Sequence, residues 1–257
     1  HPTSSIVNPS ANGTSRFNAY GICFQPASSN IYVGTDSGFL VSNDLGMSWR
    51  YINPQSNGQK NGIYSIIALS NGKVLTYGEL GIWICDNFNL TNWYQDNNKL
   101  NILDRKWKIP NAFAVSPLSN DHIFYTDIED NLFYSIDGGK NWKKILTDFG
   151  DNYGRSVYVK INPNYNDNQI DLFYGHKTTF GFKTLFWNGS DYNFSSKWNV
   201  IPYGIHSDPT DLDFGRQDKL LYATNDGGIY KSINYNQSWT LLGTPNKGYD
   251  AYQIYDI

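Results

Sequence analysis

One eight-residue segment occurs twice in this chain with little change. Residues 42–49 read SNDLGMSW and residues 135–142 read SIDGGKNW, and each copy lies between two short apolar runs. A third copy, SINYNQSW at residues 232–239, keeps the serine and the tryptophan but carries Asn234 and Asn236 at the aspartate and second glycine positions. Short apolar runs on both sides of a polar, glycine-containing turn are typical of β-strands joined by a tight connection. The chain therefore repeats a strand–turn–strand unit.

The tryptophan that ends each turn gives the period of the repeat. Two longer and less regular copies end at Trp93 and Trp198, so that successive tryptophans are 44, 49, 56 and 41 residues apart. A period of about 40 to 50 residues, with four strands per unit, is typical of a β-propeller. We therefore predict an all-β propeller with five four-stranded antiparallel blades, at about residues 17–60, 62–103, 111–150, 154–203 and 207–246.

Within the first blade we expect strands at residues 19–24, 30–34, 39–42 and 49–52. Residues 251–257 alternate like the first strand of a further blade, whereas residues 1–16 lack the three strands that would complete it. An incomplete propeller leaves blade faces uncovered. We therefore expect that the chain belongs to a larger propeller, or that a partner chain supplies the remaining blades. The start at His1 and the single methionine, Met47, also indicate a processed or partial product.

Composition narrows the classes of function. The 257 residues carry 20 basic and 23 acidic side chains, a net charge of −3, and no long basic run, which argues against nucleic acid as a partner. No apolar stretch approaches 18 residues, so membrane insertion is not expected. The four histidines are far apart, and Cys23 and Cys85 lack the spacing of metal ligands. We expect two free thiols, no metal and no cofactor.

Acidic residues recur in the loops that join the second and third strands of the blades. Asp36, Glu79, Asp127 and Asp226 occupy four of these loops, and His176 occupies the fifth. Converging carboxylates suit glycosidic bond cleavage, which needs one group to protonate the leaving oxygen and another to attack or activate water. Aspartate is equally common in ordinary Asp-Gly turns, so both interpretations stay open. Further ligand-binding candidates lie between blades: Arg105, Trp107 and Arg155.

The octapeptide resembles the Asp-box (BNR) repeat of sialidase-like propellers. In such a turn the carboxylate accepts hydrogen bonds from backbone N–H groups, a glycine adopts positive φ, and the tryptophan packs between sheets. The resemblance implies a structural role for Ser42, Asp44, Gly46 and Trp49, for Ser135, Asp137, Gly139 and Trp142, and for Ser232 and Trp239.

Two longer stretches extend the resemblance. Residues 19–26 and 31–38 are similar to the opening blade of xyloglucan-active endoglucanases built from Asp-box propellers, which implies that Asp36 is a catalytic carboxylate. Residues 206–209 and 221–232 resemble secreted bacterial Asp-box proteins and, more remotely, sortilin-type receptors, which present surfaces to ligands. A sialidase is disfavoured, because the chain has no Arg-Ile-Pro segment and only five arginines.

The prediction from sequence is therefore a secreted or cell-surface propeller that recognises or scaffolds a polysaccharide or protein ligand. The alternative is a glycoside hydrolase, in the form of a xyloglucanase-like endoglucanase, in which Asp36 works with a carboxylate outside this chain. A sialidase is the weaker form of that alternative.

Overall fold

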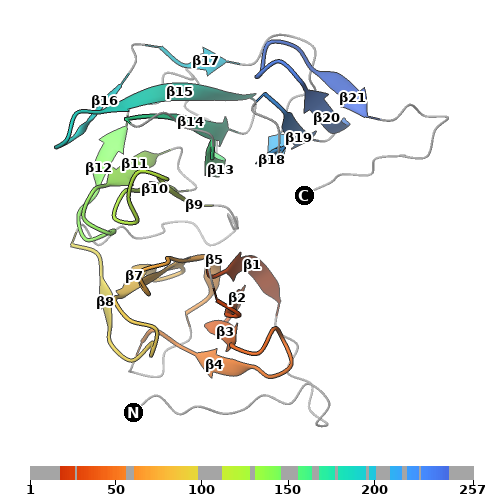
Figure 1. The fold of residues 1–257 in the computed structure, drawn as a ribbon. Coiled ribbons are helices and arrows are strands. Elements are labelled where there is room, and N and C mark those ends of the chain that lie inside the picture. Colours follow the sequence, from red (N-terminus) through yellow and green to blue (C-terminus); the bar gives the residue numbers. More distant parts are fainter. Residues whose placement is uncertain are drawn as a thin grey trace. The chain divides into compact units, whose positions relative to one another are not determined.

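The computed structural model describes residues 18–26, 28–55, 61–97, 112–127, 131–145, 156–163, 168–176, 179–194, 197–200, 209–215, 219–225 and 227–242. Within these ranges the secondary structure consists of β-strands and no helix, and the strands form five antiparallel sheets (Figure 1). In each sheet, the first four strands pair side by side in the order in which they follow one another in sequence, which is the meander of a propeller blade. The predicted fold class, an all-β propeller with five four-stranded blades, is confirmed.

The first blade contains β1 (Ala19–Phe24), β2 (Ile31–Thr35), β3 (Phe39–Ser42) and β4 (Arg50–Ile52), and the second contains β5 (Ile63–Ala68), β6 (Val74–Gly78), β7 (Gly81–Cys85) and β8 (Trp93–Gln95). The third contains β9 (Phe113–Val115), β10 (Ile123–Thr126), β11 (Leu132–Ser135) and β12 (Lys143–Ile145). The strands predicted for the first blade agree with the structure to within one residue at each end. The prediction of a further strand at residues 251–257 lies outside the described residues.

The fourth and fifth blades complete the series. The fourth contains β13 (Ser156–Ile161), β14 (Gln169–His176), β15 (Thr179–Trp187) and β16 (Tyr192–Phe194), and the fifth contains β18 (Pro209–Phe214), β19 (Leu221–Asn225), β20 (Gly228–Ser232) and β21 (Thr240–Leu242). The fourth sheet also has an unexpected fifth strand, β17 (Asn199–Val200), which pairs with Gly181 and Phe182 of β15. This occurs because β15 is long and β16 pairs only with its last three residues.

The chain divides into two compact units. The first comprises residues 1–113, 120–123 and 134–143, and the second comprises residues 114–119, 124–133 and 144–257. Each unit has its own hydrophobic core between two blades. In the first, Tyr32 and Phe39 of the first blade pack with Ile63 and Val74 of the second. In the second, Tyr158, Phe173 and Phe180 of the fourth blade pack with Leu212, Leu221 and Ala223 of the fifth.

The core follows from strand periodicity. Successive side chains of a strand point to opposite faces, and the face of the first blade that carries Tyr32, Phe39, Val41 and Ile52 is buried against the second blade. The alternate residues form the other face. Across it the register aligns Ile22 with Val33, Val33 with Leu40, and Leu40 with Tyr51. This second face is apolar but remains open to solvent, with Ile22 59% and Phe24 65% exposed.

Candidate carboxylate site

Asp36 lies at the tip of a tight turn between β2 and β3. The backbone N–H and the hydroxyl of Thr35 both donate hydrogen bonds to the Gly38 carbonyl, at 2.8 and 2.9 Å, which closes the turn. Asp36 is left half-buried, and its Oδ2 accepts a long hydrogen bond of 3.4 Å from the Asn18 side chain. The carboxylate therefore retains acceptor capacity for a ligand.

Glu79 occupies the equivalent loop of the second blade and is held from two sides. Its N–H donates to the Gly62 carbonyl at 2.8 Å, and its Oε1 accepts a 2.8 Å hydrogen bond from the Tyr64 hydroxyl. Burial, and then donation to the Glu79 carboxylate, raises the pKa of Tyr64 well above its usual value, so that the phenol stays protonated and keeps donating. A Cβ at position 62 would lie 3.2 Å from the Glu79 carboxyl carbon, which favours glycine there.

Irregular pairing at the start of the innermost strands positions two tyrosines at this end of the blades. The β1–β2 register shifts between Ala19 and Ile22, and the β5–β6 register shifts between Ile63 and Ser65. A β-bulge redirects side chains near such a shift. Tyr20 and Tyr64 lie within these two segments, and their rings meet edge to face with centroids 5.3 Å apart. Tyr64 is the residue that donates to Glu79.

Asn61 links the two carboxylate loops. Its N–H donates to the carbonyl of Ser37, the residue after Asp36, at 3.4 Å. Its side-chain Oδ1 accepts a hydrogen bond of 3.2 Å from the N–H of Leu80, the residue after Glu79. Asn61 is fully buried, and the Tyr51 hydroxyl also donates to the Ser37 carbonyl. The two loops are therefore linked by one residue, through its backbone N–H on one side and its side chain on the other.

The structure places the other predicted ligand residues differently. Asp127 caps its own loop, because its two carboxylate oxygens accept hydrogen bonds from the N–H and the side chain of Asn131, at 3.0 and 2.8 Å. The loop position predicted for His176 is wrong: it is the last residue of β14, pairs with Thr179 and is fully buried, so it occupies the place of Gly78 in the second blade, one residue before the loop. Four candidates lie outside the described residues: Arg105, Trp107, Arg155 and Asp226.

Sequence reasoning missed Tyr20, Tyr64 and Asn61. The two tyrosines did give a signal, since each is the second residue of the first strand of its blade. Asn61 gave none, because its role depends on contacts with two loops that are 24 and 19 residues away in sequence.

The octapeptide turns lie at the opposite end of the strands. Each turn forms the same pattern of internal hydrogen bonds. In residues 42–49 the Ser42 hydroxyl donates to Asp44 and accepts from the Gly46 N–H, at 2.8 and 2.7 Å. Asp44 also accepts from the N–H and hydroxyl of Ser48, at 2.8 and 2.5 Å. Equivalent bonds occur in residues 135–142. Residues 232–239 make the same contacts with Asn234 in place of aspartate, except that the Asn234 amide donates to the Ser238 hydroxyl.

Positive φ is the second property that these turns share. Their fourth and fifth residues adopt it in all three copies: Leu45 and Gly46, Gly138 and Gly139, and Tyr235 and Asn236. Glycine and asparagine tolerate this region best. In the first copy the fifth residue also accepts a hydrogen bond of 3.0 Å at its carbonyl from Trp49 Nε1. The tryptophan ring is thereby anchored to the turn.

Other chemistry finds little support among the residues that the structure describes. No group of three or more histidine, cysteine or acidic residues in these ranges could hold a metal ion. Cys23 and Cys85 are free thiols, as expected. The same ranges contain no helix long and apolar enough to cross a membrane.

Comparison with known proteins gives a fold likeness. No protein-family model and no curated protein matches the chain. The GH74 enzyme of Niastella koreensis is 13% identical, with a TM-score of 0.56 over 86% of this chain and 38% of that one. An ancestral GH74 enzyme is also 13% identical, with a TM-score of 0.58 over 90% of this chain and 34% of that one. The chain thus spans little more than a third of these enzymes, and at this identity the likeness shows the propeller fold alone.

A structure of YCF48 bound to a D1 peptide also matches, at 13% identity over 92% of this chain and 84% of that one. Its TM-score is 0.47.

Proposed function

We propose that this chain is part of a secreted or cell-surface β-propeller that recognises or scaffolds a polysaccharide or protein ligand. The ligand binds at the loop end of the first two blades, against Asp36, Glu79 and the neighbouring tyrosines. The observation that carries this proposal is the link through Asn61, which fixes two loops that each carry a carboxylate. A site held rigid before binding loses less conformational entropy when the ligand arrives.

The chemistry of this end suits hydroxyl-rich or amide-rich ligands. Carboxylates accept hydrogen bonds from sugar hydroxyls and from peptide N–H groups. Tyr20 and Tyr64 add aromatic surface with a polar tip, a combination that recurs at binding surfaces. Neither nucleic acid nor a lipid bilayer is favoured by two acidic groups at the site.

A glycoside hydrolase is the second candidate, supported by the fold likeness to GH74 enzymes and by the acidic loops. In that case Asp36 is one of the two carboxylates that cleavage requires, and its partner lies outside this chain. The substrate class is a plant-type or microbial glucan.

The turns at residues 42–49, 135–142 and 232–239 are Asp-box repeats of the BNR type in this proposal. The shared serine–aspartate network and the two positive-φ positions support it. Their role is to fix the connection from the third to the fourth strand of a blade. A catalytic role for Asp44 or Asp137 is not part of the proposal, because both carboxylates are occupied within their own turns.

The open face of the first blade is covered, in this proposal, by a further blade of the same protein or of a partner chain. Its aligned apolar residues match the kind of surface that adjacent propeller blades bury. The double variant Ile22→Ser, Phe24→Ser should reduce self-association of the 257-residue chain in light scattering. Unchanged association would count against this role for the face.

The decisive experiment measures binding by the wild-type chain and by Asp36→Asn and Glu79→Gln variants on a glycan array and a displayed peptide library. Hydrolysis of soluble glucans is assayed in parallel. Any ligand retained by the wild type should bind about tenfold more weakly to both variants, since each loses a charged acceptor. Asp213→Asn, which changes an exposed aspartate of the fifth blade, is the matched control.

The outcomes separate the candidates. Binding that both variants retain in full contradicts the proposed site, and the absence of any retained ligand contradicts the recognition role. Glucan hydrolysis that disappears in Asp36→Asn favours the hydrolase, whereas hydrolysis that persists in that variant removes Asp36 from it.

A further inference from the structure

A cleft of about 520 Å³ lies at the octapeptide end of the first two blades, away from the carboxylate loops. This volume is within the range of small-molecule sites. Both blades line it: Asn43, Ser48, Trp49 and Arg50 come from the first octapeptide turn and β4, and Phe88 and Asn89 come from the turn between β7 and β8. No residue of the carboxylate site takes part.

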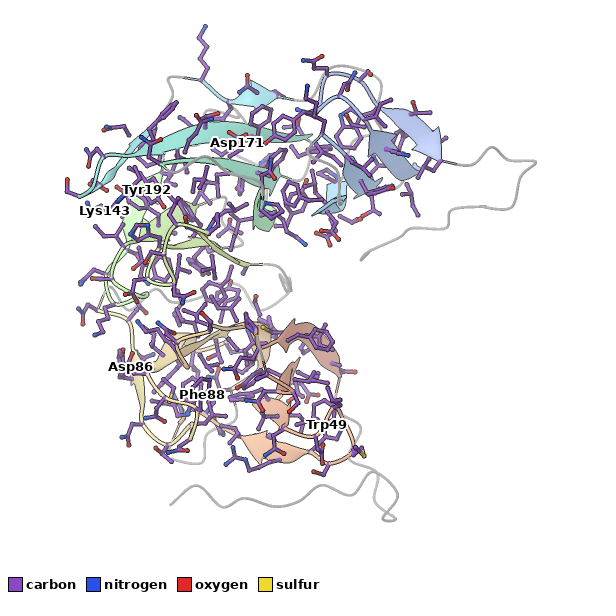
Figure 2. The ribbon with its side chains drawn as sticks, viewed as in Figure 1. Trp49, Asp86, Phe88, Lys143, Asp171 and Tyr192 are labelled. Atoms are coloured by element: carbon purple, nitrogen blue, oxygen red, sulfur yellow. The ribbon has the colours of Figure 1, made fainter. Side chains whose placement is uncertain are left out.

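Two aromatic rings from different blades line the cleft. Trp49 is fixed by the hydrogen bond from its Nε1 to the Gly46 carbonyl. Phe88 is 49% exposed and lies over Gly72, where a Cβ would come 2.7 Å from the ring (Figure 2 labels both aromatic residues). Because Trp49 is anchored and Phe88 is backed by a glycine, both rings can offer flat apolar surface without first being ordered.

Arg50 supplies a positive charge that the rest of the described chain does not neutralise. Across the described ranges its guanidinium makes no hydrogen bond, ion pair or contact with an aromatic ring, and Arg50 is exposed. The equivalent residue of the third blade, Lys143, instead lies over the Tyr134 ring at 5.6 Å. In the first blade the residue that pairs with Arg50 is Val41, which offers no ring. The carboxylate of the adjoining octapeptide turn, Asp44, already accepts hydrogen bonds from Ser42 and Ser48.

Asn43 and Asn89 complete the lining with amide groups. Both are exposed, and within the described ranges neither side chain forms a hydrogen bond. An amide can donate to one hydroxyl and accept from another. The lining therefore combines flat rings, amides for hydroxyl groups and one guanidinium for a carboxylate.

We propose that this cleft binds a sugar that carries a carboxylate, such as a uronic acid unit of an oligosaccharide. The rings of Trp49 and Phe88 contact the apolar face of the sugar, Asn43 and Asn89 hydrogen-bond its hydroxyls, and Arg50 binds the carboxylate through a charge-assisted pair. A neutral sugar would leave Arg50 unused, and a small anion without a ring would leave the aromatic walls unused. This cleft is separate from the carboxylate site, so the two proposals can be tested independently.

The test titrates the full 257-residue chain with galacturonic acid tetramer and, separately, with its carboxyl-reduced neutral counterpart, by isothermal titration calorimetry. The acidic tetramer should bind at least tenfold more tightly than the neutral one. Arg50→Gln should abolish that difference, since it removes the charge and leaves a neutral side chain that can still form hydrogen bonds. Phe88→Ala should weaken both sugars severalfold.

Two controls define the site. Lys143→Gln removes the cation at the equivalent position of the third blade and should leave binding unchanged. Asp213→Asn, which changes an exposed aspartate of the fifth blade outside both sites, should also leave it unchanged.

Three results would overturn the assignment. The first is no binding of the acidic tetramer, and the second is equal binding of both tetramers with no effect of Arg50→Gln. The third is equally tight binding of tetraglutamate, which would identify the cleft as a site for acidic peptides.

Discussion

The carboxylate of Asp44 accepts two hydrogen bonds from a single residue, Ser48: one from its N–H at 2.8 Å and one from its hydroxyl at 2.5 Å. Together with the bond from the Ser42 hydroxyl, these hold the pKa of Asp44 at about 2, below its usual value of 3.8. Each bond favours the charged form of the carboxyl group. The turn is therefore tied together by an ionised side chain at the protein surface.

Asp44 should make the stability of this turn depend on pH. Because its folded pKa is depressed, its contribution is fully present above pH 3.8 and is lost as the pH falls through about 2. The urea midpoint of the wild type should therefore decrease between pH 4 and pH 2 by more than that of Asp44→Asn. Asparagine is a suitable replacement, because Asn234 makes the same contacts in the fifth blade. Parallel decreases in the two proteins would contradict this prediction.

Replacing the Asn61 side chain should loosen the Glu79 loop. Asn61→Ala removes the acceptor for the Leu80 N–H in a fully buried place, and an unsatisfied buried donor costs about 1–3 kcal/mol. Urea denaturation should show this loss, and hydrogen exchange at Leu80 should accelerate. The exposed Asn43→Ala is the control for asparagine removal and should change stability little. Unchanged exchange at Leu80 would mean that Asn61 does not hold the loop.

Gly34 lies where the first two blades approach closely. A Cβ at this position would be 2.4 Å from the carbonyl oxygen of Ile63 in the second blade. Because backbone must move to relieve that overlap, Gly34→Ala should lower the free energy of unfolding by about 3 kcal/mol. Gly189→Ala is the comparison, since it has positive φ but nothing within 4 Å, and it should cost only about 1–2 kcal/mol. If the two variants lose the same free energy of unfolding in thermal denaturation, the contact between position 34 and the Ile63 carbonyl is not tight.

Tyr235 should contribute to the packing of the fifth blade against the fourth. Its hydroxyl donates to Asp171 and accepts from the Asn162 side chain, the latter at 2.8 Å, and its ring meets Phe173 and Phe182 edge to face. Tyr235→Phe keeps the ring contacts but removes a bond to a charged group, which is worth about 1.5–3 kcal/mol. Tyr222→Phe, on the same blade, should be nearly neutral in urea denaturation. If Tyr235→Phe leaves the free energy of unfolding unchanged, the ring alone contributes to the packing.

The sequence was sufficient to predict the number of blades and the order of their strands, because the patterns that indicate them are local. Alternation with a period of two marks each strand, and the turns that end in tryptophan recur every 41 to 56 residues. The strands of the first blade could be predicted almost to the residue for the same reason. His176 was misplaced by one residue, because the residue that closes the β14–β15 ladder is decided by pairing between the two strands and not by any single turn residue.

Only the tertiary structure decided which residues share a site. Asp36 and Glu79 were each recognisable as loop carboxylates, but their link through Asn61 depends on contacts with residues 19 and 24 positions away in sequence. The cleft at Trp49 and Phe88 likewise exists only where two blades meet. Strand identity and turn chemistry are properties of a few consecutive residues, so the sequence determines them. The contacts between blades depend on register shifts and close backbone approach, which arise only when the sheets pack.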